Sequence, residues 1–393
     1  MVLVAVGQIC STNSVAHNIS ISMQVVRDAA AAGAKAVFLP EASDYISLTN
    51  HEAYLLAEPL STHTYTSALR ATAKELGVFI SVGIHELPTP EEAKKEEPGS
   101  ERVFNTHIVI GPDGEIASFY RKLHLFDIQL KSEDSAVPGP SKRTGEHLKI
   151  IPGDTIAEPV SLGSIGKLGL EICYDIRFPE LHIILRRKGA DIIAIPSAFT
   201  VPTGRAHWAA LVRSIAISYQ VYVVAAAQAG AHNPNRSSWG EALAFDPWGT
   251  PLGRLPSIDD VDDSSKPLPP QFMLVDVDQA RVEGVREQIP LEIQKRDDVY
   301  GVVGANALQA PLATISRRHS LSPETLFTSV WNSLKALLGY RERQLDKALA
   351  ATEEGKGKVL LRGYQITPVY RRTVTRARFT FTYLRILHRF IRI

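Results

Sequence analysis

The sequence predicts an α/β fold with mixed β-sheets, and three observations lead to this prediction. Short apolar runs alternate with longer stretches of helical periodicity through residues 1–300, which is typical of α/β proteins. The turn sequence Gly-Pro-Asp-Gly at 111–114 separates two apolar runs and predicts a β-hairpin, which favours mixed sheets over all-parallel ones. The composition, 45% hydrophobic and 22% charged, is that of a globular protein.

Each element is predicted from its periodicity and its end signals. Gly33 and Gly77 end the first two helices and Pro179 begins the third, because glycine favours helix C-termini and proline fits the first helical turn. Residues 127–159 have weak periodicity and many Gly, Pro and Ser, which indicates a long functional loop. The predicted strands are 2–9, 36–39, 78–84, 103–110, 115–120, 167–173, 191–195, 221–227, 239–245, 253–255 and 272–277. The predicted helices are 18–32, 62–76, 179–188, 205–219 and 279–288.

The charge distribution divides the chain into two parts. Residues 301–393 carry 16 Lys and Arg against 5 Asp and Glu, although the whole chain has a net charge of only +1. We therefore predict a globular domain over 1–301 and a basic C-terminal extension over 302–393, partly helical at 326–351 or disordered, with unknown function and unknown partner. A disordered or foreign extension is favoured over a nucleic-acid-binding or membrane-binding one, and the domain over 1–301 is expected to bind neither nucleic acid nor membrane.

Cysteine content and hydropathy bear on the compartment. The chain has two cysteines, Cys10 and Cys173, so a disulfide framework is excluded and a reducing compartment is expected. No apolar run approaches the roughly 18 residues of a membrane span, and the N-terminus has no basic region of the kind that begins a signal peptide. We expect the cytoplasm, with mitochondria as the alternative.

Three polar residues stand at the ends of predicted strands: Glu41, Lys122 and Cys173. Sheets bring strand ends together, so these side chains can form one site. Cys173 stands where a strand meets a helix, an environment that favours a thiolate. Cys173 would attack a carbonyl carbon, with Glu41 as base and then as acid; burial is expected to raise the pKa of Glu41 toward neutrality.

The negative charge that forms on the carbonyl oxygen during this attack also needs hydrogen-bond donors or cations nearby. The Lys122 ammonium and the backbone amide of Tyr174 could stabilise the oxyanion of the tetrahedral intermediate. A second carboxylate would keep Lys122 charged, and Glu146 is the candidate, although an exposed loop acid is an equally good interpretation. Such a site needs no metal, and the histidines lack metal-ligand spacing.

Six ordered stretches resemble the nitrilase or carbon–nitrogen hydrolase superfamily. They are FLPEASDYI (38–46), YRKLHLFDI (120–128), EICYDIRFPEL (171–181), PSAFTVPTGRAHW (196–208), SSWGEALAFDPWG (237–249) and RDDVY (296–300). The resemblance implies an α-β-β-α sandwich, commonly dimerised into a four-layer stack, and therefore a homodimer. It implies Glu41 as base, Lys122 as oxyanion stabiliser, Cys173 as nucleophile and Glu146 as the second glutamate, with no cofactor and a small amide as substrate.

Within the superfamily, ASDYI (42–46) and the SAFT–TG–AHW pattern look most like the Nit branch, whose members hydrolyse deaminated glutathione. The alternatives are an ω-amidase acting on 2-oxoglutaramate, another small amide or nitrile hydrolase, and an inactive scaffold of the same fold. An anionic substrate calls for basic and polar contacts. The predicted substrate-binding residues are Tyr174, Arg177, Ser197, Thr200, Arg205 and His207.

Three positions depart from the pattern of the branch: Glu171, Ser214-Ile215 and Glu241. Strand alternation places Glu171 on the same face as Cys173, with Arg177 as a candidate ion-pair partner. Arg177 could instead pair with Asp175 or Glu180. These departures leave the exact substrate open.

Overall fold

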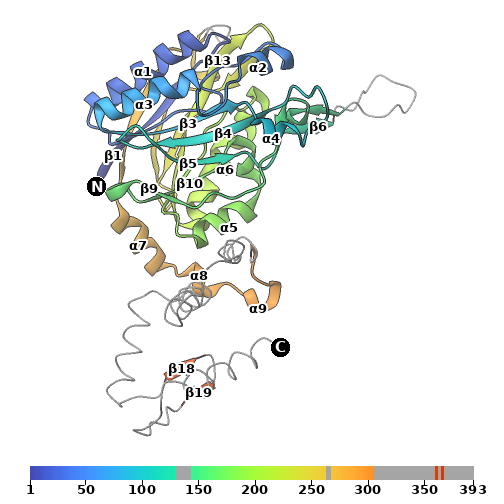
Figure 1. Ribbon diagram of the computed structural model, residues 1–393. Helices are drawn as coiled ribbons and strands as arrows, with labels where there is room; N and C mark the ends of the chain where they lie inside the picture. Colours follow the sequence, from blue (N-terminus) through green and yellow to red (C-terminus); the bar gives the residue numbers. More distant parts are fainter. Residues whose placement is uncertain (130–142, 263–266, 305–358, 362–363, 367–393) are drawn as a thin grey trace, which may run out of the picture. The chain divides into compact units, whose positions relative to one another are not determined.

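The computed structural model describes residues 1–129, 143–262, 267–304, 359–361 and 364–366 (Figure 1). The chain divides into two compact units, Met1–Gln309 and Ala310–Ile393. In the second unit the described residues form an antiparallel pair of strands, β18 (Val359–Leu361) and β19 (Tyr364–Ile366). The helix predicted at 326–351 lies outside the described residues, and the domain boundary at 301 stays a prediction.

The first unit contains two mixed sheets. Across its described residues, the larger sheet has nine strands. They are β14 (Arg236–Trp239), β13 (Ala227–Asn233), β1 (Val2–Ile9), β2 (Ala36–Phe38), β3 (Phe79–Glu86), β4 (Val103–Ile110) and β5 (Ile116–Arg121), with β17 (Gln271–Val277) beside β1 and β8 (Ile150–Ile151) beside β4. Strands β1, β2 and β3 are parallel, and β3–β4–β5 is an antiparallel meander. Strands β2 and β5 therefore run in the same direction and end at the same edge.

The smaller sheet carries six strands in the described part of the chain. They are β16 (Pro251–Arg254), β15 (Leu243–Phe245), β12 (Tyr222–Ala225), β11 (Ile192–Ala194), β10 (Lys167–Leu170) and β9 (Val160–Ser161). Strands β10, β11 and β12 are parallel, and the outer strands are antiparallel. A further hairpin, β6 (Asp127–Gln129) with β7 (Arg143–Gly145), lies in the segment that was predicted as a loop.

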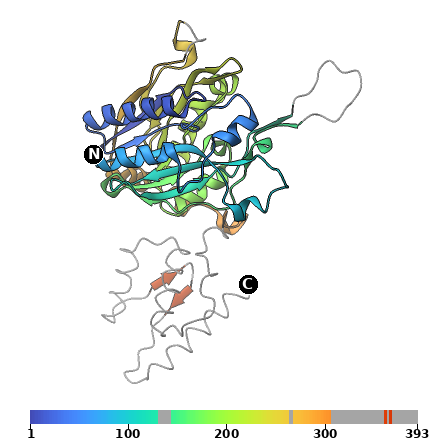
Figure 2. The same ribbon diagram turned by 45° about the horizontal axis from the view of Figure 1, so that its top comes forward.

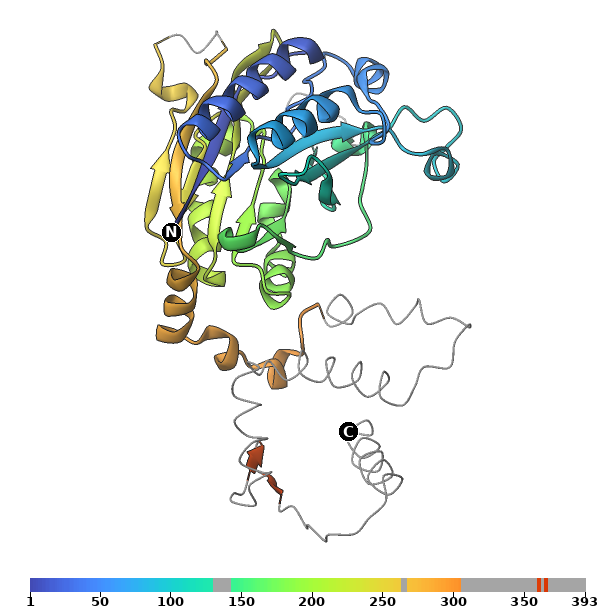
Figure 3. The ribbon, with the colours of Figure 1, turned by 60° about the vertical axis from the view of Figure 1, so that its left-hand side comes forward.

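Helices cover the outer faces of both sheets, so the layers are α-β-β-α, as predicted (Figure 1). Helices α1 (Val15–Ala31) and α3 (Thr64–Leu76) lie side by side over the larger sheet (Figure 2). Helices α5 (Pro179–Arg187) and α6 (Val201–Tyr219) cover the smaller one. The remaining α-helices of the described residues are α2 (Asn50–Leu56), α4 (Pro90–Ala93), α7 (Gln279–Gln288), α8 (Leu291–Gln294) and α9 (Asp297–Tyr300), of which α7 follows β17 directly (Figure 3).

The core follows the period-2 alternation of the strands. In β1, Ala5 and Ile9 pack with the helices over the larger sheet, whereas Val4 and Val6 pack between the two sheets. Helix α6 begins at Val201, earlier than predicted, because Pro202 fits a first helical turn. The described residues include no helix that combines the length and hydropathy needed to cross a membrane.

Candidate active site

The strand ends bring the predicted catalytic residues to one edge of the sandwich. Glu41 follows β2, and Lys122 comes directly after β5, which ends at the same edge of the larger sheet. Cys173 begins a short 3₁₀ helix after β10 in the smaller sheet. All three side chains are buried, so the site lies between the two sheets rather than on the surface.

Lys122 is held between two carboxylates. Its Nζ donates to Glu41 Oε1 at 3.0 Å and lies 2.8 Å from Glu146 Oε2. Burial alone would lower the pKa of Lys122, but the charges of Glu146 and Glu41 raise it well above the ordinary value. Lys122 is therefore a fixed cation, and Glu146, which also accepts from the Phe126 amide at 2.9 Å, keeps it in place.

Glu41 receives hydrogen bonds on both carboxylate oxygens. Asn105 Nδ2 donates to Oε1 at 2.7 Å, and the Ala198 amide donates to Oε2 at 2.8 Å. Burial raises the pKa of this carboxyl, but Lys122 and the hydrogen bonds from Cys173, Lys122 and Asn105 outweigh burial and lower the pKa. The expectation of a pKa near neutrality is therefore wrong: the site holds Glu41 ionised, as a base requires.

The surroundings of Cys173 disfavour the thiolate, whereas a strand–helix junction was expected to favour it. Burial, followed by the neighbouring Glu41 charge, raises the pKa of the Cys173 thiol well above its ordinary value, although Lys122 opposes the shift. The resting thiol is therefore protonated, and the prediction of a favoured thiolate is wrong. The backbone at Cys173 is left-handed, with φ of 48°, and its amide donates to the Pro196 carbonyl at 3.0 Å. Such strain is often found at functional residues.

The backbone of Glu41 is fixed by close neighbours. A Cβ atom on Gly83 of β3 would lie 2.6 Å from Glu41 Cα and 3.2 Å from the Pro40 carbonyl oxygen, so only glycine fits there. The buried Gln228 side chain donates to the Glu41 carbonyl at 3.0 Å. Gln228 and Asn105 were missed from the sequence; a polar residue within an apolar strand is the signal that could have found Asn105.

The predicted substrate-binding residues are only partly brought together. Arg177 Nη2 contacts His207 Nδ1 at 3.0 Å, and the Arg177 guanidinium lies 5.8 Å from the ring centre of Tyr174. No carboxylate of the described residues lies within 4.0 Å of Arg177, because Asp175 is turned inward to Tyr120 and His124. Arg177 and His207 are therefore available to an anion beside Tyr174.

The other three candidates are engaged elsewhere. Ser197 is buried, and its hydroxyl donates to the Ile195 carbonyl at 3.1 Å. Thr200 precedes α6 and contacts Thr203 at 2.8 Å. Arg205 is exposed and forms a two-point ion pair with Asp259, at 2.6 and 2.7 Å. Their roles in substrate binding stay predictions.

The residues that depart from the family pattern make defined contacts within the fold. Glu171 is fully buried and contacts His182 Nδ1 at 2.5 Å, so its expected partner Arg177 is wrong. Burial raises the pKa of Glu171, and the Glu171 charge outweighs burial to raise the pKa of His182. Glu241 accepts from Trp239 and Arg254, and Ile215 packs in the core between the sheets and α6. These contacts hold together the segments that surround the site.

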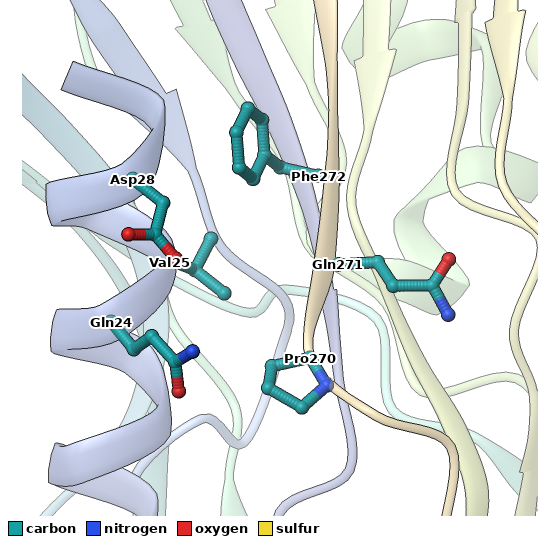
Figure 4. Close-up of a pocket in the computed structure, with 6 residues that line it drawn as sticks. All are labelled: Gln24, Val25, Asp28, Pro270, Gln271 and Phe272. Atoms are coloured by element: carbon teal, nitrogen blue, oxygen red, sulfur yellow. The ribbon is translucent and has the colours of Figure 1, made fainter. Parts of the chain in front are cut away.

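Two of the cavities in the described part of the chain lie beside elements of the larger sheet. One, of about 260 Å³, lies between α1 and β17 (Figure 4); its lining of Gln24, Val25, Asp28, Pro270, Gln271 and Phe272 includes no catalytic candidate. The other is lined by Glu41, Ala42, Tyr45, Ile46, Ser47, His85, Asn105, Glu146, Lys149, Ile150, Ala198 and Arg236. Within the described ranges, no group of three or more His, Cys, Asp or Glu side chains could hold a metal ion.

Known proteins are similar to this chain in sequence and in fold. A deaminated glutathione amidase from Bos taurus is 36% identical over 303 residues, covering 77% of this chain and 84% of that protein. A probable hydrolase, nit2, from Schizosaccharomyces pombe is 37% identical and covers 77% of this chain and all of that protein. The crystal structure of the C. elegans NitFhit protein superposes with a TM-score of 0.64 at 35% identity, covering 76% of this chain and 66% of that one.

The family model described as carbon-nitrogen hydrolase matches residues 3–283, which include every strand end that contributes to the site. The match, the α-β-β-α layers and the buried Glu, Lys and Cys agree on one assignment. This chain belongs to the carbon–nitrogen hydrolase family.

Proposed function

We propose that this protein is an amidase that hydrolyses deaminated glutathione through a thioester on Cys173. The observation that carries the proposal is the buried contact of Lys122 with Glu41 and Glu146, next to a thiol that hydrogen-bonds to Glu41. The relatives named for that activity, and the fold that they share with this chain, support the substrate.

In the proposed reaction, Glu41 takes the thiol proton as Sγ of Cys173 attacks the amide carbon. Lys122 and the Tyr174 backbone amide stabilise the oxyanion. Protonated Glu41 then gives its proton to the departing amine, which leaves an acyl group on sulfur. Glu41, ionised again, takes a proton from the water that attacks the thioester carbon, and it returns this proton to the departing sulfur as the C–S bond breaks, which releases the acid and the free thiol. The lowered pKa of Glu41 supports its role as the base in both halves.

Deaminated glutathione joins a 2-oxoglutaryl group to cysteinylglycine through an amide, so the acyl group itself carries a carboxylate. We propose that Arg177, with His207, binds this carboxylate, because the guanidinium has no acidic partner among the described residues and lies beside Tyr174. Arginine can bind a carboxylate through two parallel hydrogen bonds.

The test is a substrate panel of deaminated glutathione, 2-oxoglutaramate and simple nitriles. The proposal expects turnover of deaminated glutathione with the highest kcat/KM. Preferred turnover of 2-oxoglutaramate would favour the ω-amidase alternative. If no compound is hydrolysed and Cys173 is not acylated, the protein is an inactive scaffold.

We also propose a homodimer formed through helix α6, which covers the outer face of the smaller sheet. Ile217 of α6 and the nearby Trp248 are about half exposed, at 46% and 49%, and together they place two large apolar side chains on this surface. Light scattering after gel filtration would give the mass, and a monomer at micromolar concentration would contradict this proposal.

A further inference from the structure

A buried histidine of α5 bridges the two ends of the segment that carries the nucleophile. His182 Nδ1 contacts Glu171 Oε1 at 2.5 Å, and His182 Nε2 contacts the Ile176 carbonyl oxygen at 3.2 Å. Glu171 lies two residues before Cys173, and Ile176 lies three residues after it. His182 therefore connects the end of the strand that leads to the nucleophile with the 3₁₀ turn that follows it.

The protons on the His182 ring decide whether both contacts are hydrogen bonds. Both ring nitrogens face oxygen atoms, whereas a neutral imidazole carries only one N–H group. Burial lowers the pKa of His182, but the charge of Glu171 outweighs burial and raises it, which agrees with a proton on each nitrogen. Nδ1 is then bound to Glu171, and Nε2 donates to the Ile176 carbonyl. Glu171 thus acts on the turn through the ring of His182.

The backbone at Cys173 needs such a restraint. Its left-handed conformation, with φ of 48°, is unfavourable for a residue with a side chain and persists only where the neighbouring structure fixes it. The same turn carries the Tyr174 amide, the expected oxyanion donor. If the Ile176 carbonyl were released, the turn could relax and move the thiol of Cys173 away from Glu41.

The turn is held from two sides. On the side of the larger sheet, Asp175 accepts a hydrogen bond from the Tyr120 hydroxyl at 2.8 Å. On the side of α5, His182 supplies the contact to the Ile176 carbonyl. The two contacts act on neighbouring residues of the turn, so loss of either leaves it held from one side only.

Stability alone does not explain the Glu171–His182 pair. Glu171 is fully buried, and its Oε2 atom has no hydrogen-bond partner among the described residues. An unsatisfied buried oxygen is costly, and apolar side chains of similar size often give equal or greater stability than a buried ion pair. The pair therefore fits a role in holding the turn better than a role in stabilising the core.

We propose that Glu171 and His182 are positioning residues, which hold the turn after β10 so that the thiol of Cys173 reaches its base. The inference rests on the proposed function, because it takes Cys173 as the nucleophile of an amidase. It goes beyond that function, since it assigns the placement of the nucleophile to two residues outside the catalytic candidates.

The double substitution Glu171→Met/His182→Leu separates positioning from stability. It removes the bridge and leaves no buried charge, so the protein should fold with an unfolding midpoint in urea no lower than that of wild type. Its kcat for deaminated glutathione should nevertheless fall about tenfold to 100-fold, because the thiol no longer lies where Glu41 takes its proton. Glu171→Gln should keep kcat within about threefold of wild type, since its amide can donate to Nδ1 and leave the Nε2 proton on the Ile176 carbonyl.

Alkylation of Cys173 by iodoacetamide measures the same placement without an amide substrate. Sγ bonds to the reagent carbon, iodide leaves and the thiol proton passes to Glu41, so the rate reports whether the thiol lies beside its base. By mass spectrometry at neutral pH, this rate should be about tenfold lower in the double variant and close to wild type in Glu171→Gln. The buried Cys10 should stay unmodified in every folded variant. As a control, Thr72→Val, which removes a hydrogen bond within α3 on the outer face of the larger sheet, should change neither rate.

Wild-type kcat and alkylation rate in a folded double variant would overturn the proposal, as would a fall in kcat with an unchanged alkylation rate. A loss in Glu171→Gln as large as in the double variant would also overturn it, because the charge rather than the bridge would then matter. Failure of the double variant to fold would assign the pair to the fold and not to the nucleophile. If wild-type protein hydrolyses no amide, the proposed function fails, and the alkylation rates decide the inference by themselves.

Discussion

Replacing Gly83 by alanine tests whether the backbone around Glu41 is fixed by packing. The added Cβ would lie 2.6 Å from Glu41 Cα, whereas ordinary contact begins at 3.4 Å, so β3 and the backbone of Glu41 must separate by about 0.8 Å. Overpacking of this kind destabilises a protein by about 1–3 kcal/mol. A displacement of catalytic groups by about 1 Å can lower the rate roughly 100-fold.

The expected result is a fall in kcat/KM of about 100-fold together with a loss of about 1–3 kcal/mol in the free energy of unfolding. Hydrolysis of deaminated glutathione and urea denaturation measure the two effects on the same preparation. Gly284→Ala in α7 is the matched control, because its Cβ meets no atom within 4 Å; it should raise stability by about 0.5–1 kcal/mol and leave activity unchanged. Wild-type kcat/KM in Gly83→Ala would refute the reasoning.

Three further predictions concern the nucleophile, the base and the buried Glu171–His182 pair. Cys173→Ala should abolish turnover while the circular dichroism spectrum and unfolding midpoint stay close to wild type; retained turnover would mean another nucleophile. Because the pKa of Glu41 is lowered, kcat/KM should keep its neutral-pH value down to the ordinary Glu value of 4.5 and fall only below it; a fall near neutrality would contradict an ionised Glu41. The raised pKa of His182 contributes stability that is present below its ordinary value of 6.5 and is lost as pH rises through the folded-state pKa. In urea titrations at about pH 6 and about pH 8, His182→Gln should therefore lose less stability over that interval than wild type, and equal losses would exclude the pair as the cause.

The sequence by itself predicted an α/β fold with mixed sheets and the positions of the catalytic candidates, and the family resemblance added the α-β-β-α layers. Polar residues that directly follow short apolar strands must lie at sheet edges, and the direction of each strand follows from the connections between them. This is why Glu41, Lys122 and Cys173 could be placed before any coordinates. The second glutamate, Glu146, was a candidate because Lys122 needs a carboxylate, but its segment has little periodicity, and the family resemblance was needed to favour it over an exposed loop acid.

The charge states of the site residues, and the side chains that contact them, were decided by the tertiary structure alone. The pKa of Glu41 depends on Lys122, Asn105 and the Ala198 amide, which come from distant parts of the chain and meet only when the two sheets pack. Likewise the sequence suggested Arg177 as the partner of Glu171, but the packing of α5 brings His182 to it. Periodicity shows which side of a strand is buried, whereas it cannot show which side chain from another element arrives there.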